Sequence, residues 1–317
     1  MLKAIVKRLA SSLLSLLILV ALVFAATHFT PGGPAYSILG QKATPASIAA
    51  LNARLGLNQS LVHQFVVWVW HLLHGNLGYS YLLNAPVERV MLVFERNTIV
   101  LYLLVTVLTF IFSVILGLIH GVYRSRLIGN AVGAYQLIFY AMPGFFLAPV
   151  LIIIFSVQLG WLPASGIVDL RNPNPPLWSY IIHLILPTTV MTLLGTAGLS
   201  RYFAASVREE LGKDYVRTAL AKGVSFRSVL YGHVLRNALR PLVTLMGLSL
   251  PGIFTGGIIV ESIFGYPGLG WLMWRSALTQ DYPILIGIVL VIGILTVLGN
   301  LLADLVNSLM DPRASYE

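Results

Sequence analysis

The sequence predicts an all-α membrane protein with six transmembrane helices, and its composition is the first reason. Of the 317 residues, 57% are hydrophobic and only 10% are charged, and the mean hydropathy is +0.86. Soluble domains carry about 25% charged residues, so this chain could not cover its own surface in water. The second reason is that long apolar runs recur along the chain. The third is that Lys and Arg gather in alternate connecting segments, which explains the net charge of +9 without a nucleic acid partner.

The first predicted span is the apolar run from Leu9 to about Phe29, which follows Lys3, Lys7 and Arg8. The run is longer than the apolar part of a signal peptide, and further spans follow it. We therefore expect residues 1–30 to form a cytoplasmic N-terminus and a retained first transmembrane helix.

Residues 31–97 predict a helical subdomain outside the membrane. It opens with the turn cluster PGGP at 31–34. Thr44 and Pro45 favour the start of a short helix. Residues 59–73 form an amphipathic segment with Trp68 and Trp70, which is typical of a helix at a membrane interface. His63, His71 and His74 on this segment have no acidic residue or Cys nearby, so we predict no metal site there.

Residues 98–317 predict a core of five more helices. The third predicted span contains Met142-Pro143-Gly144, where proline should kink the helix. The fourth contains Pro187. The predicted spans are residues 98–122, 131–159, 179–199, 241–263 and 283–306.

Six spans place both termini on one side of the membrane. With the N-terminus inside, the inner segments hold 14 Lys and Arg and the outer segments hold 6, although the outer segments are longer in total. The positive-inside rule therefore predicts an N-in, C-in topology with the 201–240 loop in the cytoplasm.

The 201–240 loop carries eight of the twenty Lys and Arg residues. Gly212 is the predicted end of the fourth helix, and Asp214 is the predicted N-cap of a short helix that Gly223 ends. Ser225 is the predicted cap of the next helix. Residue types alone leave two interpretations open, a rigid docking elbow or a solvated basic loop that only fixes the topology.

The sequence of this loop resembles the signature loop of ABC-importer permeases. Residues 214–223 read DYVRTALAKG, and residues 233–241 read HVLRNALRP. The general motif is Glu-Ala-Ala, three residues, then Gly, and it aligns with Arg217, Thr218, Ala219 and Gly223. The departure from Glu is familiar in the dipeptide, oligopeptide and nickel branch. Motifs similar to that branch extend over nearly the whole chain: PGGPA at 31, LGL at 55, GNLG at 75, LGWLPASG at 159, ESIFGYPGLG at 261, DYP at 281 and DPR at 311.

This resemblance implies a type I importer fold and a B-type permease subunit with the outer subdomain after its first span. It implies transport of peptides, with nickel or a metal chelate as the alternative, across the inner membrane of a bacterium. In the family, the short cytoplasmic helix lies in a groove of an ATPase subunit. The contact set it implies here is Asp214, Tyr215, Arg217, Ala219, Lys222 and Gly223. The implied partners are a second, C-type permease subunit, ABC ATPase subunits, an extracytoplasmic substrate-binding protein and membrane lipid.

The fifth predicted span is our candidate for lining the transport pathway. Pro251, Gly252, Gly256 and Gly257 make it the most deformable span, and Glu261 is a candidate gate residue beside the outer loop. Asp304 is a second carboxylate near a span end. The pair Gly117 and Gly121 predicts close helix packing, inside the bundle or between subunits.

Several classes of function are disfavoured by what the sequence lacks. There is no Walker sequence, so ATP hydrolysis must come from partner subunits, and we predict neither an enzyme nor a cofactor. There is no Cys for thiol chemistry. A secondary transporter, the rival interpretation, should show an internal repeat and buried ion ligands, and neither is evident. Ser113, Ser156 and His120 fall in predicted spans but form no recognised catalytic motif.

Overall fold

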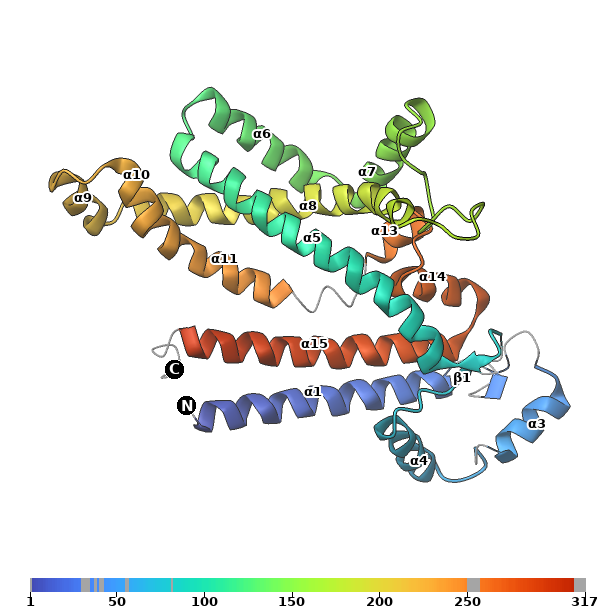
Figure 1. Cartoon of the computed structure of the whole chain (residues 1–317). Helices are drawn as coiled ribbons and strands as arrows, with labels where there is room; N and C mark the ends of the chain where they lie inside the picture. Colours follow the sequence, from blue (N-terminus) through green and yellow to red (C-terminus); the bar gives the residue numbers. More distant parts are fainter. Residues whose placement is uncertain are drawn as a thin grey trace. The chain divides into compact units, whose positions relative to one another are not determined.

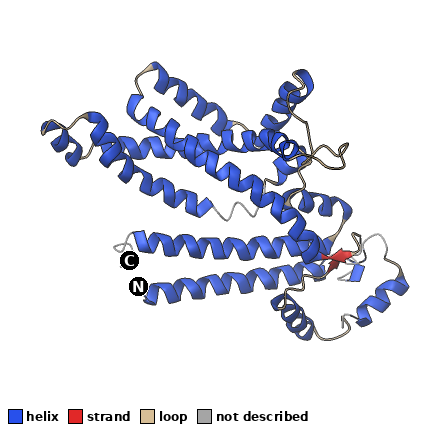
Figure 2. Ribbon diagram, in the orientation of Figure 1, coloured by secondary structure: helices blue, strands red, loops and turns tan. Residues whose placement is uncertain are grey.

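The computed structural model describes residues 2–29, 35–36, 39, 43–54, 57–80, 82–249 and 257–310. The turn cluster at 31–34, the motif at 311–313 and the predicted pathway residues Pro251, Gly252 and Gly256 lie outside the described residues, as does the side chain of Asp304. The described part is almost entirely helical, with one short two-stranded hairpin (Figure 2). It divides into two compact units, which are described separately.

The first unit contains Met1–Ile99, Pro251–Ile258 and Pro267–Glu317. Its two long helices, α1 (Leu2–Phe29) and α15 (Tyr282–Met310), lie side by side in Figure 1. Gly293 of α15 makes this close approach possible, because a Cβ at that position would clash with the side chain of Leu19.

The outer part of this unit contains the short helices α3 (Pro45–Arg54) and α4 (Leu61–Leu73). Helix α3 begins where the sequence predicts it, with the Ser47 amide donating to Thr44 Oγ1 at 3.2 Å. Helix α4 packs on α1 through Phe24, whose ring centroid lies 5.1 Å from that of Phe65 and 5.6 Å from that of Trp68.

An antiparallel hairpin follows α4, with strands β1 (Tyr79–Ser80) and β2 (Ala85–Pro86). The sequence pattern of this segment does not indicate a hairpin. Buried Ser80 donates a hydrogen bond from Oγ to Asp281 Oδ2, at 2.5 Å. A contact between residues 201 positions apart therefore fixes the hairpin to the start of α15.

Two helices in this unit extend beyond the predicted elements. Helix α5 (Val87–Tyr123) begins eleven residues before the predicted second span. Helix α14 (Leu269–Thr279) replaces much of a predicted outer loop. The early start of α5 and the presence of α14 have the same cause. Both helices bury apolar side chains in one core with α15. That core consists of Val87, Met91, Leu269, Leu272, Ile284 and Ile288.

The second unit contains Val100–Leu250 and Ile259–Tyr266. Besides the remainder of α5, it holds α6, α8 and α11 as its longer helices and several shorter ones (Figure 1). Their bounds are α6 (Leu127–Ala141), α7 (Gly144–Leu151), η2 (Ile152–Gln158), α8 (Leu177–Leu211), α9 (Asp214–Ala221), α10 (Phe226–Val229), η3 (Leu230–Val234), α11 (Leu235–Ser249) and α13 (Ile258–Ile263).

Three described helices are long and apolar enough to cross a membrane: Val87–Tyr123, Leu177–Leu211 and the Tyr282–Asn300 part of α15. A fourth candidate is the pair formed by α6 and by α7 with η2, which is bent by 108° at Met142-Pro143. The sequence predicts this break, but as a kink. The observed bend is sharper because Met142 and Pro143 both adopt extended backbone angles. The structure thus shows a helical membrane protein with three or four candidate spans.

Candidate functional site

The 201–240 loop is fixed to the rest of its unit by a polar network. The Lys213 ammonium pairs with Glu210 Oε1 at 2.5 Å, and the Tyr215 hydroxyl donates to Glu210 Oε2 at 2.7 Å. Asn237 of α11 donates from Nδ2 to the same hydroxyl, at 3.5 Å. Three helices, α8, α9 and α11, are therefore joined around one carboxylate.

The protonation states of this network are stable at neutral pH. Burial raises the pKa of the Tyr215 phenol, and the bond to Glu210 raises it further. The hydrogen bond to Glu210 raises the pKa of the Lys213 ammonium. The phenol accordingly keeps its proton and the amine its charge, so both donors remain available to the carboxylate.

The apolar side of α9 packs on a buried core. Val216 is only 2% exposed and lies among Phe203 and Val207 of α8 and Val229 and Val234 beyond α9. Tyr215 and Ala219 pack against the same core. A helix of this length is too short to be stable alone, so these contacts hold it in position.

The start of α9 differs from the prediction. Lys213, not Asp214, is the N-cap residue, and no side chain caps the helix there. Asp214 is the first helical residue, and its carboxylate lies 3.6 Å from Arg217 in an exposed pair. Lys213 has an extended backbone conformation, and its ammonium pairs with Glu210. Asp214, in the first turn of α9, still interacts favourably with the helix dipole.

The end of α9 agrees with the prediction. Gly223 has a φ of +82°, a left-handed conformation that favours glycine. The Gly223 amide donates to Leu220 O at 3.0 Å and the Val224 amide to Ala219 O at 3.2 Å, which is the Schellman pattern. Ser225 then caps α10 by accepting from the Ser228 amide at 3.3 Å.

The predicted contact set divides between two faces of this elbow. Asp214, Arg217, Lys222 and Gly223 are exposed, whereas Tyr215 and Ala219 are half-buried and turned toward the core.

Three exposed apolar side chains were missed by the sequence analysis. Leu220 is 40% exposed, Val224 39% and Phe226 42%. Their position on either side of Gly223 in an otherwise polar loop was the available signal. Together with the exposed polar residues they form a mixed surface on which another protein could dock.

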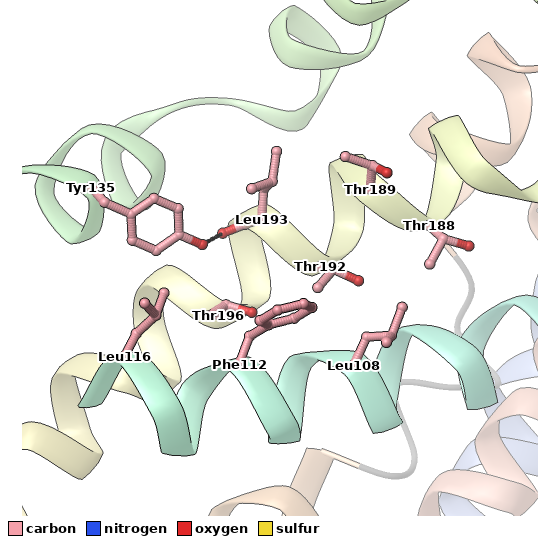
Figure 3. A pocket seen from close by; sticks show the side chains of 9 residues that line it. All are labelled: Leu108, Phe112, Leu116, Tyr135, Thr188, Thr189, Thr192, Leu193 and Thr196. Carbon is pink, nitrogen blue, oxygen red and sulfur yellow. Dashed lines mark hydrogen bonds between the residues drawn. The ribbon is translucent and has the colours of Figure 1, made fainter. Parts of the chain in front are cut away.

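A second feature is a pocket of about 320 Å³ between α5, α6 and α8 (Figure 3). The Tyr135 hydroxyl closes one side by donating to Leu193 O at 2.7 Å. The lining residues are Leu108, Phe112 and Leu116 on α5, Tyr135 on α6, and Thr188, Thr189, Thr192, Leu193 and Thr196 on α8.

Buried hydroxyls without hydrogen-bond partners gather beside this pocket. Thr188, Thr192 and Thr196 follow one another at helical spacing and are at most 7% exposed. The Oγ1 atoms of Thr188 and Thr192 have no partner among the described residues, whereas Thr196 lies within reach of the Tyr135 hydroxyl. The hydroxyls of Thr109 and Ser113 of α5 likewise have no partner in the described part of the chain. A Cβ at Gly195 would lie 3.1 Å from Thr109 Cγ2, so the two sets face each other.

Thr189 provides the contrast on the same helix. Its hydroxyl donates to the backbone oxygen of Ile185, one helical turn earlier, at 2.7 Å, a bond that helical threonines can form. The pocket was not predicted, although threonines spaced four apart in the fourth predicted span were a signal for it.

The predicted pathway residues that the structure describes are Gly257 and Glu261. Glu261 lies on α13 and is fully buried. The Tyr266 amide donates to Glu261 O at 2.8 Å, and the Tyr102 and Tyr266 phenols are close enough to interact electrostatically with the carboxylate. The structure thus places Glu261 in a packed interior, away from the lining of the pocket.

Two other predicted features have clear surroundings. Gly117 and Gly121 pack against α8, which is the internal alternative predicted for this pair. His74 bonds through Nδ1 to Trp70 O at 2.8 Å. Among the described residues, no three His, Cys, Asp or Glu side chains come together as a metal site.

Comparison with known proteins now decides the family. Residues 113–316 match the family described as the inner membrane component of binding-protein-dependent transport systems, and residues 1–115 match its N-terminal membrane component. The chain belongs to this family. These inner membrane components are permease subunits of ABC importers without an ATPase site of their own, and they work with other permease, ATPase and substrate-binding subunits.

Relatives match this permease over its full length. The oligopeptide transport system permease protein AppB of Bacillus subtilis is 34% identical over 98% of this chain and 99% of its own. The oligopeptide permease OppB of Haemophilus influenzae is 32% identical over 100% of both chains. A putative peptide transport system permease protein of Brucella abortus is 36% identical over 99% of both.

Proposed function

We propose that this chain is the B-type permease subunit of an ATP-driven peptide importer in a bacterial inner membrane. The observation that carries this proposal is similarity to peptide and oligopeptide permeases over the whole chain. These relatives do not favour the alternative of nickel or a metal chelate as substrate.

Six spans in an N-in, C-in arrangement remain our interpretation of the topology. It is supported by three long apolar helices and the bent pair, by α1, and by the distribution of Lys and Arg. In this arrangement residues 1–30 hold the first span, residues 31–97 form the outer subdomain, and residues 98–317 form the five-helix core with the 201–240 loop in the cytoplasm.

The exposed face of the α9 elbow is the proposed contact with an ATPase subunit. Its polar members are Asp214, Arg217, Lys222 and Gly223, and its apolar members are Leu220, Val224 and Phe226. The network around Glu210 joins α9 to both α8 and α11. Movement of the ATPase subunits would therefore reach two long helices at once.

The contact between α5 and α8 is the proposed place where the pathway opens. Its buried hydroxyls Thr109, Ser113, Thr188 and Thr192 have no hydrogen-bond partner among the described residues, whereas water or the amides of a peptide could pair with them once the helices separate. Separation would thus recover hydrogen bonds instead of breaking them. The Pro251–Glu261 segment remains a second proposed part of the pathway, with Glu261 as a gate.

The expected complex contains this chain, a C-type permease subunit, ABC ATPase subunits and an extracytoplasmic substrate-binding protein. The test is peptide uptake by proteoliposomes that contain this complex. Phe226→Asp should abolish ATPase association and uptake because it places a charge in the apolar part of the contact. Leu170→Asp, at a position that is 90% exposed outside the elbow, is the matched control. Uptake by this chain without any ATPase, driven by an ion gradient, would contradict the proposal.

A further inference from the structure

Three basic side chains lie close together where α5, α6 and α8 pack against one another, and one of them belongs to the 201–240 loop. They are His120 in the last turn of α5, Arg124 directly after α5, and Arg208 near the end of α8. We call these three residues the basic recess.

Glycines bring the helices together at this point. A Cβ at Gly121 would lie 2.8 Å from Cβ of Val207, the neighbour of Arg208. A Cβ at Gly133 of α6 would lie 2.9 Å from Cε1 of His120. Gln136 of α6 donates from Nε2 to Ser200 Oγ of α8, at 3.0 Å. The recess is therefore built from three closely packed helices and is not an accidental cluster on a mobile surface.

The charges of the recess are not balanced by the protein. Arg124 and Arg208 are close enough to repel each other, and both repel a protonated His120. The nearby acidic residues Glu209 and Glu210 pair with Lys213 instead. Among the described residues, no ion pair includes Arg124 or Arg208.

One nitrogen atom of the recess, Nη1 of Arg208, is buried and lacks a partner among the described residues. His120 forms a side-chain hydrogen bond with Gln136 and lies against Gly133 of α6. A buried nitrogen like that of Arg208, next to like charges, is unfavourable unless an anion pairs with it. Arg124 is exposed, so it marks the open side from which an anion can enter.

We propose that the basic recess binds the phosphate of an anionic phospholipid. Arginine matches the paired oxygens of a phosphate in a planar, bidentate geometry. Basic pockets between transmembrane helices on the cytoplasmic side are suited to anionic headgroups. None of its three residues belongs to the proposed ATPase contact, and the proposal does not depend on which solute is transported.

The surroundings favour a lipid over a free phosphate ion. Leu127 is 87% exposed and Ile128 is 53% exposed at the start of α6, beside Arg124 in the chain. These side chains offer an apolar surface to the acyl chains of a lipid whose headgroup occupies the recess. Arg126, over the Tyr123 ring at 5.2 Å, adds the aromatic and basic pairing typical of the interfacial region.

The experiment is a titration of the purified full-length chain in detergent with phosphatidylglycerol or phosphatidylcholine, followed by native mass spectrometry. Phosphatidylglycerol should bind more tightly, and Arg124→Gln and Arg208→Gln should each weaken its binding about fivefold. Arg201→Gln is the matched control, because Arg201 is exposed and stacks on Tyr140 at 5.1 Å. Arg208→Lys, which keeps the charge, should bind phosphatidylglycerol more tightly than Arg208→Gln.

Several results would overturn the proposal. One is equal binding of the two lipids, and another is recess variants that behave like Arg201→Gln. Inorganic phosphate that displaces phosphatidylglycerol at millimolar concentration would identify a free anion as the ligand. Loss of ATPase association in Arg208→Gln with unchanged lipid binding would identify a protein carboxylate instead. Because Arg124 is exposed, its variant keeps the test valid even if Arg208→Gln fails to fold.

Discussion

The α9 elbow and the contact between α5 and α8 differ in whether their polar side chains are paired. In the elbow, one carboxylate, one ammonium, one phenol and one amide pair with one another. In the α5–α8 contact, Thr109, Ser113, Thr188 and Thr192 are buried without partners among the described residues. Both regions lie in the same compact unit, so the difference is local.

This difference indicates which part transmits force and which part opens. A satisfied network resists distortion, because breaking it leaves charged or polar atoms unpaired. A contact with unpaired hydroxyls loses little polar interaction when it separates and gains hydrogen bonds with water. The elbow is thus suited to carry the motion of an ATPase subunit, and the α5–α8 contact is suited to yield to it.

Val216→Asp should have the largest effect, because it buries an unpaired carboxylate in the elbow. The expected loss is roughly 3–5 kcal/mol in the free energy of unfolding, with detachment of α9 and loss of peptide uptake. Thermal unfolding and uptake in proteoliposomes measure the two effects. Thr218→Asp, on the exposed side of the same helix, should leave the stability nearly unchanged. A folded, active Val216→Asp variant would show that α9 does not depend on this packing.

Tyr215→Phe should have an intermediate effect. It removes the hydroxyl that donates to Glu210 and accepts from Asn237, and a hydrogen bond to a charged group contributes about 1.5–3 kcal/mol. We expect lower thermal stability and weaker coupling of ATP hydrolysis to uptake. Tyr231→Phe, in which an exposed side chain loses the same atom, should change neither quantity. If Tyr215→Phe and Tyr231→Phe behave alike, the network around Glu210 does not contribute to coupling.

Thr192→Val should have a smaller effect of opposite sign on stability. Valine has nearly the same shape as threonine and removes a buried hydroxyl without a partner, so the closed arrangement should gain about 1 kcal/mol. The same substitution should slow uptake, since the open arrangement loses a group that can bond to water or peptide. Thr189→Val is the control, because its hydroxyl already bonds to Ile185 O, and its removal should not bring this gain. Faster uptake by Thr192→Val would contradict the proposal that the pathway opens at the contact between α5 and α8.

The local features of both regions were predictable from sequence. Gly223 and Ser225 were assigned correctly because a helix end depends on residues within one turn. The break at Pro143 was predictable because proline at that position cannot continue the hydrogen-bond ladder. The close packing at Gly117 and Gly121 follows from the absence of side chains.

Features that depend on distant residues were not predictable. Lys213 replaces Asp214 as the cap residue where its ammonium pairs with Glu210 on the preceding helix. The hairpin depends on a bond between Ser80 and Asp281. The unpaired hydroxyls appear only when α5 and α8 are placed together, because a threonine in a helix usually donates to its own backbone. Sequence patterns report spacing along one element, and these features require the packing of two.

Arg217→Ala should have the smallest effect on stability, and this makes it a direct test of the elbow as a contact surface. Arg217 and Asp214 form an exposed pair, with side chains 76% and 96% exposed, and such pairs contribute about 0–1 kcal/mol. If the exposed face docks on an ATPase subunit, Arg217→Ala should weaken ATPase association and make it less sensitive to salt, while thermal unfolding stays unchanged. Arg227→Ala, exposed on α10, is the control outside α9. If ATPase association and its salt dependence are both unchanged, Arg217 contributes only to the positive charge of the inner side. The docking contact would then depend on Leu220, Val224 and Phe226.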